Sequence, residues 1–140
     1  MNRKELLQIL IENLTKALHT MNTGNSFPFG KLMLTKQQIM ILFFIYEKKD
    51  TTSVKEIATF LNVTPGAVTQ LVDGLVEKKL VQREKNLLDG RIINIQLTTN
   101  TERQFNKFKK NYLETASKSF DSLSDKELGQ FIKLIQKIKK

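Results

Sequence analysis

Small and hydrogen-bonding side chains gather near the middle of the chain. They are Thr64, Pro65, Ala67, Thr69 and Gln70. A glutamine amide can form two hydrogen bonds with adenine, and the methyl group of threonine or alanine can contact the methyl group of thymine. Because these side chains are short, the backbone that carries them can come close to a base pair. The set therefore predicts contact with DNA bases in the major groove; the alternative is an ordinary solvent-exposed helix surface.

A second candidate group surrounds a predicted turn. Asp89-Gly90 is a turn signal, Arg91 follows it directly, and Lys85 precedes it. A long cation at that place could reach a phosphate or a minor groove, with Lys85 beside it. A plain surface charge is the alternative. The same segment contains Leu87 and Leu88, which either pack beneath the turn or form an exposed apolar tip.

The first group needs a helix that presents its beginning. Thr64 is a good N-cap, and Pro65 suits the first helical position, where its missing N–H costs nothing. The helix is expected to end near Lys79. The apolar residues that follow Pro65 recur at helical spacing and predict a buried face, consisting of Val68, Leu71, Val72, Leu75 and Val76.

A shorter helix is predicted just before this one. Ser53 and Glu56 have the spacing of a capping box, in which each side chain accepts a hydrogen bond from the backbone N–H of the other residue. Residues 62–65 then break the pattern. Two helices across so short a break have the spacing of a helix-turn-helix. The shorter helix has a narrow apolar stripe of Ile57, Ala58 and Leu61.

Two strand-like runs lie on either side of the predicted turn. In residues 93–97, isoleucine or leucine alternates with asparagine or glutamine, which is the pattern of a half-buried strand. Residues 81–84 are its expected partner. The sequence therefore predicts a β-hairpin directly after the helix-turn-helix, in the position of a wing.

These segments resemble the winged-helix core of MarR-family transcriptional regulators. The resemblance is carried by residues 61–73 (LNVTPGAVTQLVD), by residues 77–81 (EKKLV), and by Asp89-Gly90-Arg91 followed by Leu97-Thr98. The wing element with its arginine is the most specific part. The order and length of the helices outside the core also fit the family.

The resemblance implies an obligate homodimer whose second core helix enters the major groove and whose wing arginine, here Arg91, reaches the minor groove. It implies that Asp89 orients the wing and its arginine. In this family, small aromatic or phenolic ligands often modulate DNA binding. The chain differs from many members at Gln70, where a basic residue is common, and at Leu87-Leu88, where polar residues or proline are more common.

Amphipathic helices are predicted on both sides of the core. They span residues 3–21, about 36–47, about 99–120 and about 125–138, and capping boxes at Thr35, Thr99 and Ser124 precede the last three. Residues 22–30 are predicted to be a loop, and residues 48–52 a polar connection. In the second helix the residues expected to be largely buried are Ile39, Leu42, Phe43, Ile45 and Tyr46.

The predicted fold is mainly α-helical with a small β-wing. Residues 1–140 form one domain, in which residues 34–99 are the winged helix-turn-helix core and residues 1–21 and 100–140 are dimerisation helices. The outer helices carry more apolar surface than the small core can cover, and such surface costs roughly 25 cal/mol per Å² left in water. We therefore expect a two-fold dimer; for residues 3–21, packing on their own domain is the alternative.

Composition excludes several functional classes. The chain has no cysteine and one histidine, which excludes disulfides and thiolate zinc sites and disfavours a strong transition-metal site. No acid, base and nucleophile come together, so we expect no enzyme activity and no cofactor. No apolar run approaches the ~18 residues that span a bilayer, and the first residues do not look like a secretory signal. The expected location is the cytoplasm.

The net charge of +9 is unevenly distributed. Residues 51–97 carry six basic and five acidic side chains, so the excess of positive charge lies in the flanking segments. Charge alone therefore supports DNA binding only weakly, and flanking lysines would have to supply part of the sequence-independent attraction.

Together these patterns predict a dimeric, sequence-specific DNA-binding transcriptional regulator, acting as a repressor on a pseudo-palindromic operator in double-stranded DNA. The alternative function is a winged-helix protein-interaction module that does not bind DNA. A small aromatic effector could bind an apolar cleft between the dimer helices and the core, with Phe27, Phe43 and Tyr112 as candidate lining residues. For Phe27, simple packing on the core is the alternative.

Overall fold

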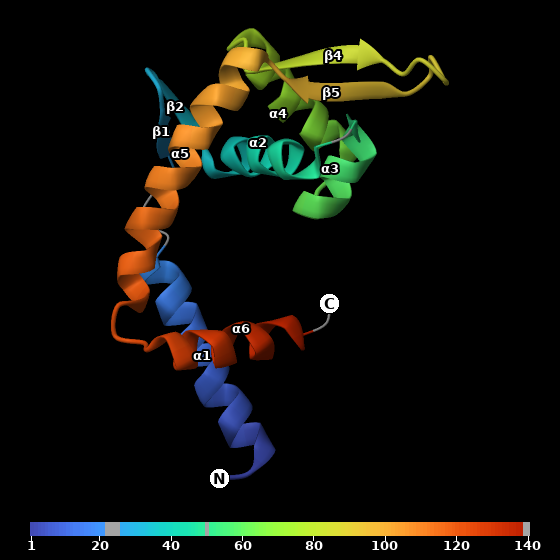
Figure 1. The fold of residues 1–140 in the computed structure, drawn as a ribbon. Coiled ribbons are helices and arrows are strands. Elements are labelled where there is room, and N and C mark those ends of the chain that lie inside the picture. The colour runs from blue at the N-terminus through green and yellow to red at the C-terminus, as the bar shows by residue number, and fades with distance from the viewer. Residues whose placement is uncertain (22–25, 50, 139–140) are drawn as a thin grey trace. The chain divides into compact units, whose positions relative to one another are not determined.

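The computed structural model describes residues 1–21, 26–49 and 51–138 and divides the chain into two compact units (Figure 1). One unit comprises Gly24–Lys109. The other comprises Met1–Thr23 together with Lys110–Lys140. Helix α5, Thr99–Ser117, contributes its first part to one unit and its last part to the other.

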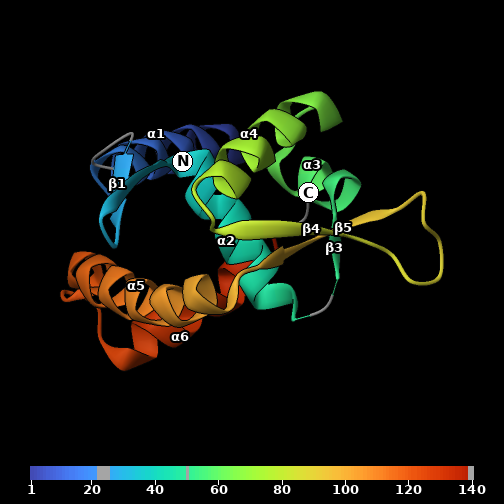
Figure 2. The same ribbon diagram turned by 90° about the horizontal axis from the view of Figure 1, so that it is seen from above.

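The unit Gly24–Lys109 contains a helix-turn-helix followed by a wing, as the sequence predicts. Helix α2, Lys36–Lys48, precedes the two helices of the motif, α3, Val54–Leu61, and α4, Pro65–Glu77. A three-stranded antiparallel sheet has the order β3-β5-β4 (Figure 2). Its strands are β3, Thr52–Ser53, β4, Val81–Lys85, and β5, Ile93–Leu97.

The apolar face of α4 forms the centre of this unit. Val68, Val72 and Leu75 are fully buried, in a cluster that includes Ile41 and Leu42 of α2, and this confirms the helical spacing seen in the sequence. One expectation for α2 was wrong, because Phe43 is 42% exposed. Two residues after the fully buried Ile41, a helical side chain points about 200° away, so Phe43 lies on the other side of α2.

The start of α3 differs from the predicted capping box. Ser53 Oγ accepts a hydrogen bond from the backbone N–H of Glu56 over 3.2 Å, as expected. The Glu56 carboxylate, however, accepts a hydrogen bond from the Ser53 hydroxyl and pairs with the Lys48 ammonium instead of returning to the Ser53 backbone. The ion pair with the end of α2 draws the carboxylate away from the position that the reciprocal box requires.

Two of the segments predicted to lack regular structure contain strands. Where a loop was expected over residues 22–30, the described part forms a hairpin of β1, Ser26–Phe29, and β2, Leu32–Thr35; residues 22–25 lie outside the described residues. Gly30 permits the turn, with φ of 59°. Pro28 fits because a two-stranded sheet has only edge strands. Thr52 and Ser53 pair with β5, so the predicted connection is also partly strand.

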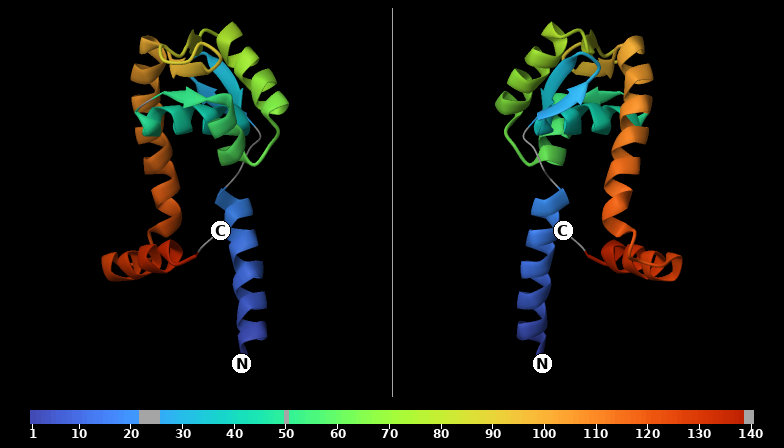
Figure 3. Two further views of the ribbon diagram at one scale, coloured as in Figure 1. Left: turned by 90° about the vertical axis from the view of Figure 1, so that its right-hand side faces the viewer. Right: turned by 90° about the vertical axis from the view of Figure 1, so that its left-hand side faces the viewer.

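The same hairpin contributes to the core, because Phe29 and Leu34 are 2% and 1% exposed. It lies beside the first part of α5, as Figures 1 and 3 show. There the buried ring of Phe105 has its centroid 6.2 Å from that of Phe29 and 5.0 Å from that of Tyr46.

The N-cap of α5 lies one residue before the predicted one. Thr98, not Thr99, caps it, because Thr98 Oγ1 accepts a hydrogen bond from the backbone N–H of Thr101 over 3.4 Å. The Thr98 hydroxyl also lies 3.1 Å from the carbonyl oxygen of Lys79, to which it can donate. Adjacent threonines offer two possible N-cap residues, and this contact with the segment after α4 stabilises the earlier one.

The second unit consists of α1, Arg3–Met21, the end of α5, a short 3₁₀ helix, Lys118–Phe120, and α6, Asp125–Gln136. The predicted capping box at Ser124 is present in full. Hydrogen bonds from the Ser124 backbone and side chain hold the pKa of Glu127 below its usual value of 4.5. None of the helices in the described part of the chain is long and apolar enough to cross a bilayer.

Both α1 and α6 expose apolar side chains in the single chain. The ring of Phe131 lies 6.4 Å from that of Phe120, measured between centroids, and is still 37% exposed. Such a row of apolar residues on an amphipathic helix normally lies against another surface. The other exposed apolar residues are Leu6, Leu7, Ile9, Leu10, Ile11, Leu14 and Leu18 of α1, Ile132, Leu134 and Ile135 of α6, and Ile138 just after it.

Candidate nucleic-acid interface

The beginning of α4 exposes most of the side chains that the sequence singled out. Thr64, Pro65, Thr69 and Gln70 are exposed, and Ala67 is half-buried. Thr64 Oγ1 accepts a hydrogen bond from the backbone N–H of Ala67, so this threonine caps the helix as predicted. The sequence placed a helix start here because of a threonine N-cap and a proline in the first turn. The structure confirms both.

Gln70 is a polar group of this surface that remains available for a ligand. The Thr69 hydroxyl donates to the carbonyl oxygen of Pro65 over 3.0 Å, so its hydrogen is already used within the helix. Within the part of the chain that the structure describes, the Gln70 amide makes no hydrogen bond, and the residue is exposed. This arrangement suits two hydrogen bonds to one flat partner such as a base edge.

The wing is a β-hairpin whose tip is closed by backbone hydrogen bonds. Its strands pair from Val81 with Leu97 to Lys85 with Ile93. Beyond them the Asn86 N–H donates to the carbonyl oxygen of Ile92 over 2.9 Å. Figures 1 and 2 show the hairpin extending away from α2 and α4. The predicted turn at Asp89-Gly90 is present, because the Ile92 N–H donates to the Asp89 carbonyl over 3.0 Å.

Asp89 holds Arg91 in a defined position while leaving it open to solvent. Asp89 Oδ1 accepts hydrogen bonds from the Arg91 backbone N–H over 3.0 Å and from Nε over 3.2 Å. The Arg91 side chain is nevertheless 92% exposed, whereas that of Asp89 is 38% exposed. The carboxylate therefore orients the guanidinium at the tip, and the remaining guanidinium donors are free to meet an anion. Lys85 is exposed at the end of β4, on the other side of the loop.

Sequence reasoning missed Asn86, which shapes the tip. Asn86 Oδ1 accepts hydrogen bonds from the backbone N–H groups of Leu88, over 2.8 Å, and of Asp89, over 3.2 Å. The signal was present, because an asparagine at the start of a loop commonly bonds the backbone two residues further on. Leu87 and Leu88 point outward and are fully exposed, which decides between the two alternatives left open by the sequence.

A second missed contact joins the wing to α4. The Arg83 guanidinium, on β4, pairs with the Asp73 carboxylate, on the outer side of α4. Such a surface pair contributes only about 0–1 kcal/mol to stability. Its effect is positional, because it connects the base of the wing to the helix whose start exposes Gln70. No local sequence pattern indicates a contact between residues on different elements.

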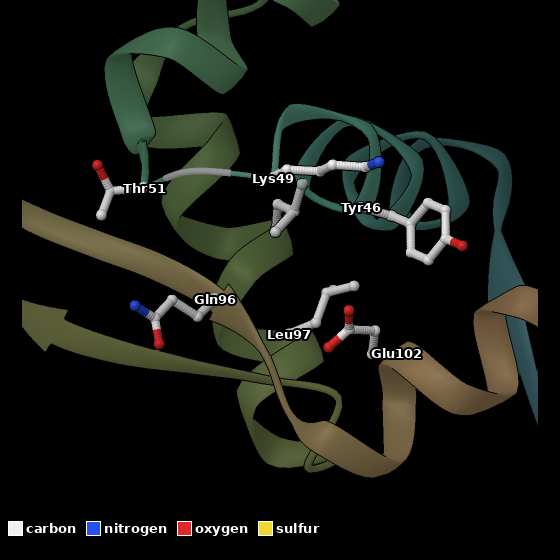
Figure 4. A pocket seen from close by; sticks show the side chains of 7 residues that line it. Tyr46, Lys49, Thr51, Gln96, Leu97 and Glu102 are labelled. Atoms are coloured by element: carbon white, nitrogen blue, oxygen red, sulfur yellow. The ribbon is translucent and has the colours of Figure 1, made fainter.

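The three candidate effector residues are divided between the two units. Phe27 and Phe43 belong to the unit Gly24–Lys109, whereas Tyr112 belongs to the other unit. A cavity of about 740 Å³ lies instead among α2, β5 and α5, as Figure 4 shows. Its lining combines the Tyr46 phenol, the Lys49 ammonium and the Glu102 carboxylate with apolar Leu97, and it includes none of the three candidates.

This arrangement of a helix-turn-helix and a hairpin with an exposed arginine defines a winged-helix protein. The sequence model of the MarR family matches residues 34–92. The uncharacterized HTH-type transcriptional regulator YpoP of Bacillus subtilis is 33% identical over 107 residues, which cover 76% of this chain and 75% of YpoP.

Two further comparisons agree. The HTH-type transcriptional repressor YetL of Bacillus subtilis is 31% identical over 103 residues, 73% of this chain, and the chain spans 62% of the length of YetL. The crystal structure of the transcriptional regulator BldR from Sulfolobus solfataricus matches with a TM-score of 0.74 at 22% identity, covering 99% of this chain and 100% of BldR.

The chain belongs to the MarR family of transcriptional regulators. This confirms the resemblance inferred from residues 61–98 and the fold class that it implied. It also confirms that the chain is not an enzyme, because the family and its named relatives are transcriptional regulators.

Replacing Asp89 with Ala should loosen the tip of the wing. The substitution removes the acceptor of the Arg91 backbone N–H, so that amide should exchange with solvent several-fold faster, as measured by NMR hydrogen exchange. The Val81 amide, at the base of the hairpin, serves as the reference and should exchange as before. Glu84→Ala removes an exposed carboxylate from β4 and is the matched control. An unchanged exchange rate at Arg91 would show that Asp89 does not order the turn.

Proposed function

We propose that the protein is a dimeric, sequence-specific DNA-binding repressor. The observation that carries the proposal is the pairing of an exposed α4 start, with Gln70 unpartnered within the described residues, and a wing that holds Arg91 exposed. The name of YetL, a transcriptional repressor, supports the direction of regulation. On this proposal α4 enters the major groove, and the wing reaches the minor groove.

Each candidate residue then has a role that its surroundings allow. Pro65, Ala67 and the methyl group of Thr69 make apolar contacts near thymine methyl groups, while Gln70 bonds an adenine. Thr64 fixes the first turn of α4 and lies beside the backbone of the DNA. At the wing, Arg91 enters the minor groove or meets its phosphates, Lys85 assists it, and Asp89 orients it.

The dimer is proposed from the exposed apolar side chains of α1 and α6. We assign residues 1–21 and 100–140 to dimerisation and residues 34–99 to the winged helix-turn-helix core. In a two-fold dimer the two α4 helices can lie about 34–36 Å apart, one turn of B-form DNA, and the operator is then a pseudo-palindrome. Ile132 and Ile135 of α6, which are 55% and 49% exposed, become covered.

Analytical ultracentrifugation tests the dimer without DNA. At micromolar concentration the protein should sediment as a species of twice the 16.2 kDa chain mass. Replacing Ile132 and Ile135 with Asp places charge in the proposed interface and should give monomers. Lys126→Asp, which changes the charge of an exposed residue in the first turn of α6, is the control and should remain dimeric. A folded wild-type monomer would refute this part of the proposal.

DNA binding is tested with a duplex selected by the wild-type protein from a random library. Arg91→Ala should weaken binding several-fold and reduce the salt dependence of the affinity, because one phosphate or minor-groove contact is lost. Gln70→Ala should lower discrimination between the selected duplex and one with a changed base pair by about 1–3 kcal/mol. Fluorescence anisotropy at fixed salt measures both effects.

Arg103→Ala is the matched control for Arg91, because Arg103 is an exposed arginine that is not among the proposed DNA contacts. An affinity of Arg91→Ala equal to that of this control would argue against a wing contact. A uniform loss on all sequences for Gln70→Ala would argue against base recognition. The near-neutral charge of residues 51–97 favours one other function, a protein-interaction module, and failure of the wild type to select any duplex would support it.

Effector control is proposed from the family resemblance and from the exposed ring of Phe43, which is 42% exposed with Lys109 Nζ 5.8 Å from its centroid. We propose that a small aromatic ligand binds at Phe43, with Phe27 as a further candidate in the same unit, and relieves repression. It can do so only by binding two arrangements of the dimer with different affinity. Salicylate at millimolar concentration should weaken operator binding, and Phe43→Ala should reduce that effect; equal sensitivity of the two proteins would refute the assigned site.

A further inference from the structure

The tip of the wing exposes two leucine side chains completely. Leu87 and Leu88 are 102% and 98% exposed, whereas the other exposed large apolar residues between residues 26 and 109, Met33, Phe43 and Ile92, are 42–59% exposed. Burial of a leucine side chain is favourable in water, so two adjacent ones at full exposure are unusual for a soluble surface. They require an explanation that single scattered apolar residues do not.

The leucines are presented by an ordered loop. The Asn86 N–H donates to the Ile92 carbonyl, and Asn86 Oδ1 accepts a hydrogen bond from the backbone of Leu88 itself. The Asp89 carbonyl accepts from the Ile92 N–H on the other side. These bonds determine the path of the backbone from residue 86 to residue 92 and leave both leucine side chains outside it.

Arg91 lies on the same closed loop. Leu88 lies three positions before it, and three residues of extended chain reach at most ~11 Å. A minor groove is ~6 Å wide and ~7.5 Å deep. Leu87 and Leu88 therefore lie close enough to Arg91 along the chain to reach the same groove or its rim.

We propose that Leu87 and Leu88 form an apolar wedge that enters the minor groove beside Arg91 and partly unstacks a base step. The inference rests on the proposed DNA-binding function and extends it to the way the operator is distinguished. Leucine is among the side chains that separate base steps from the minor groove and bend the duplex toward the major groove. Pyrimidine–purine steps unstack most easily, so the operator should carry TA or CA/TG steps under each wing.

The size and charge of the tip favour DNA over other occupants. Two leucine side chains offer far less than the ~1,000 Å² that a stable protein interface needs, so a second protein would gain little from them. The same hairpin carries Arg91, held exposed by Asp89, and the exposed Lys85. A phosphate-lined groove satisfies the cations and the leucines together.

The test uses the full-length protein and the duplex that the wild type selects from a random library. 2-Aminopurine, which fluoresces more strongly when unstacked, replaces each adenine in turn at the outer part of each half-site. Wild-type protein should increase the fluorescence at one step under the wing. The double variant Leu87→Ser with Leu88→Ser should bind at least about tenfold more weakly and lose that increase. Its salt dependence should not change, because no phosphate contact is removed.

Two controls separate the wedge from general effects of substitution. Met33→Ser removes another exposed apolar side chain, on β2, and should bind as the wild type does. Leu87→Met with Leu88→Met retains apolar side chains of similar length and should restore both affinity and fluorescence. Thermal unfolding of each variant should match the wild type, since all three exposed positions tolerate polar groups.

The outcomes distinguish this inference from the proposed function. If the wild type binds its selected duplex but the serine variant binds equally well, or if no 2-aminopurine position responds, the wedge is refuted and DNA binding stands. If the wild type selects no duplex, both fail. Binding to vesicles of phosphatidylcholine and phosphatidylserine that depends on Leu87 and Leu88, without an effect on DNA, would assign the tip to a membrane surface and overturn the wedge.

Discussion

Burial of one face of α4 determines which of its side chains can meet a ligand. With Val68, Val72 and Leu75 fully enclosed, the helical period places Thr69 and Gln70 outward. Gly74 permits this packing, because a Cβ there would lie 3.2 Å from Nε2 of the buried Gln38 on α2. The exposed surface of α4 is thus a consequence of the core: a change that rotates the helix to repack the apolar face would also rotate Gln70.

The wing obtains its shape in a different way. Its tip has no apolar core, and polar side chains from its own loop hold it. Asn86 and Asp89 bond the backbone of the loop, while Arg83 connects the strand to Asp73 of α4. Each of these interactions contributes little to stability, but together they leave few conformations for the loop of the wing. The candidate interface therefore combines a surface set by packing with one set by local hydrogen bonds.

Local signals in the sequence predicted most of the fold. A threonine followed by proline marked the start of α4, and alternating residues marked β5, because caps and periodicity depend on neighbours along the chain. Errors arose where distant contacts decide. The Glu56 carboxylate forms an ion pair with Lys48 of the preceding helix instead of completing the capping box. Thr98 is the N-cap of α5 because its hydroxyl also contacts the Lys79 carbonyl. The exposure of Leu87 could not be predicted, since it depends on how Asn86 folds its loop.

The charge distribution explains why apolar groups at the wing would matter. Residues 51–97 carry almost no net charge, so the winged core contributes little of the attraction that DNA of any sequence exerts on a basic protein. The contribution of such a core to DNA affinity then depends on the DNA sequence. It comes from contacts with bases or from the energy needed to deform a particular base-pair step. Leucines at the tip act through the second route, because an apolar side chain makes no ion pair and is favoured only where the bases separate to receive it.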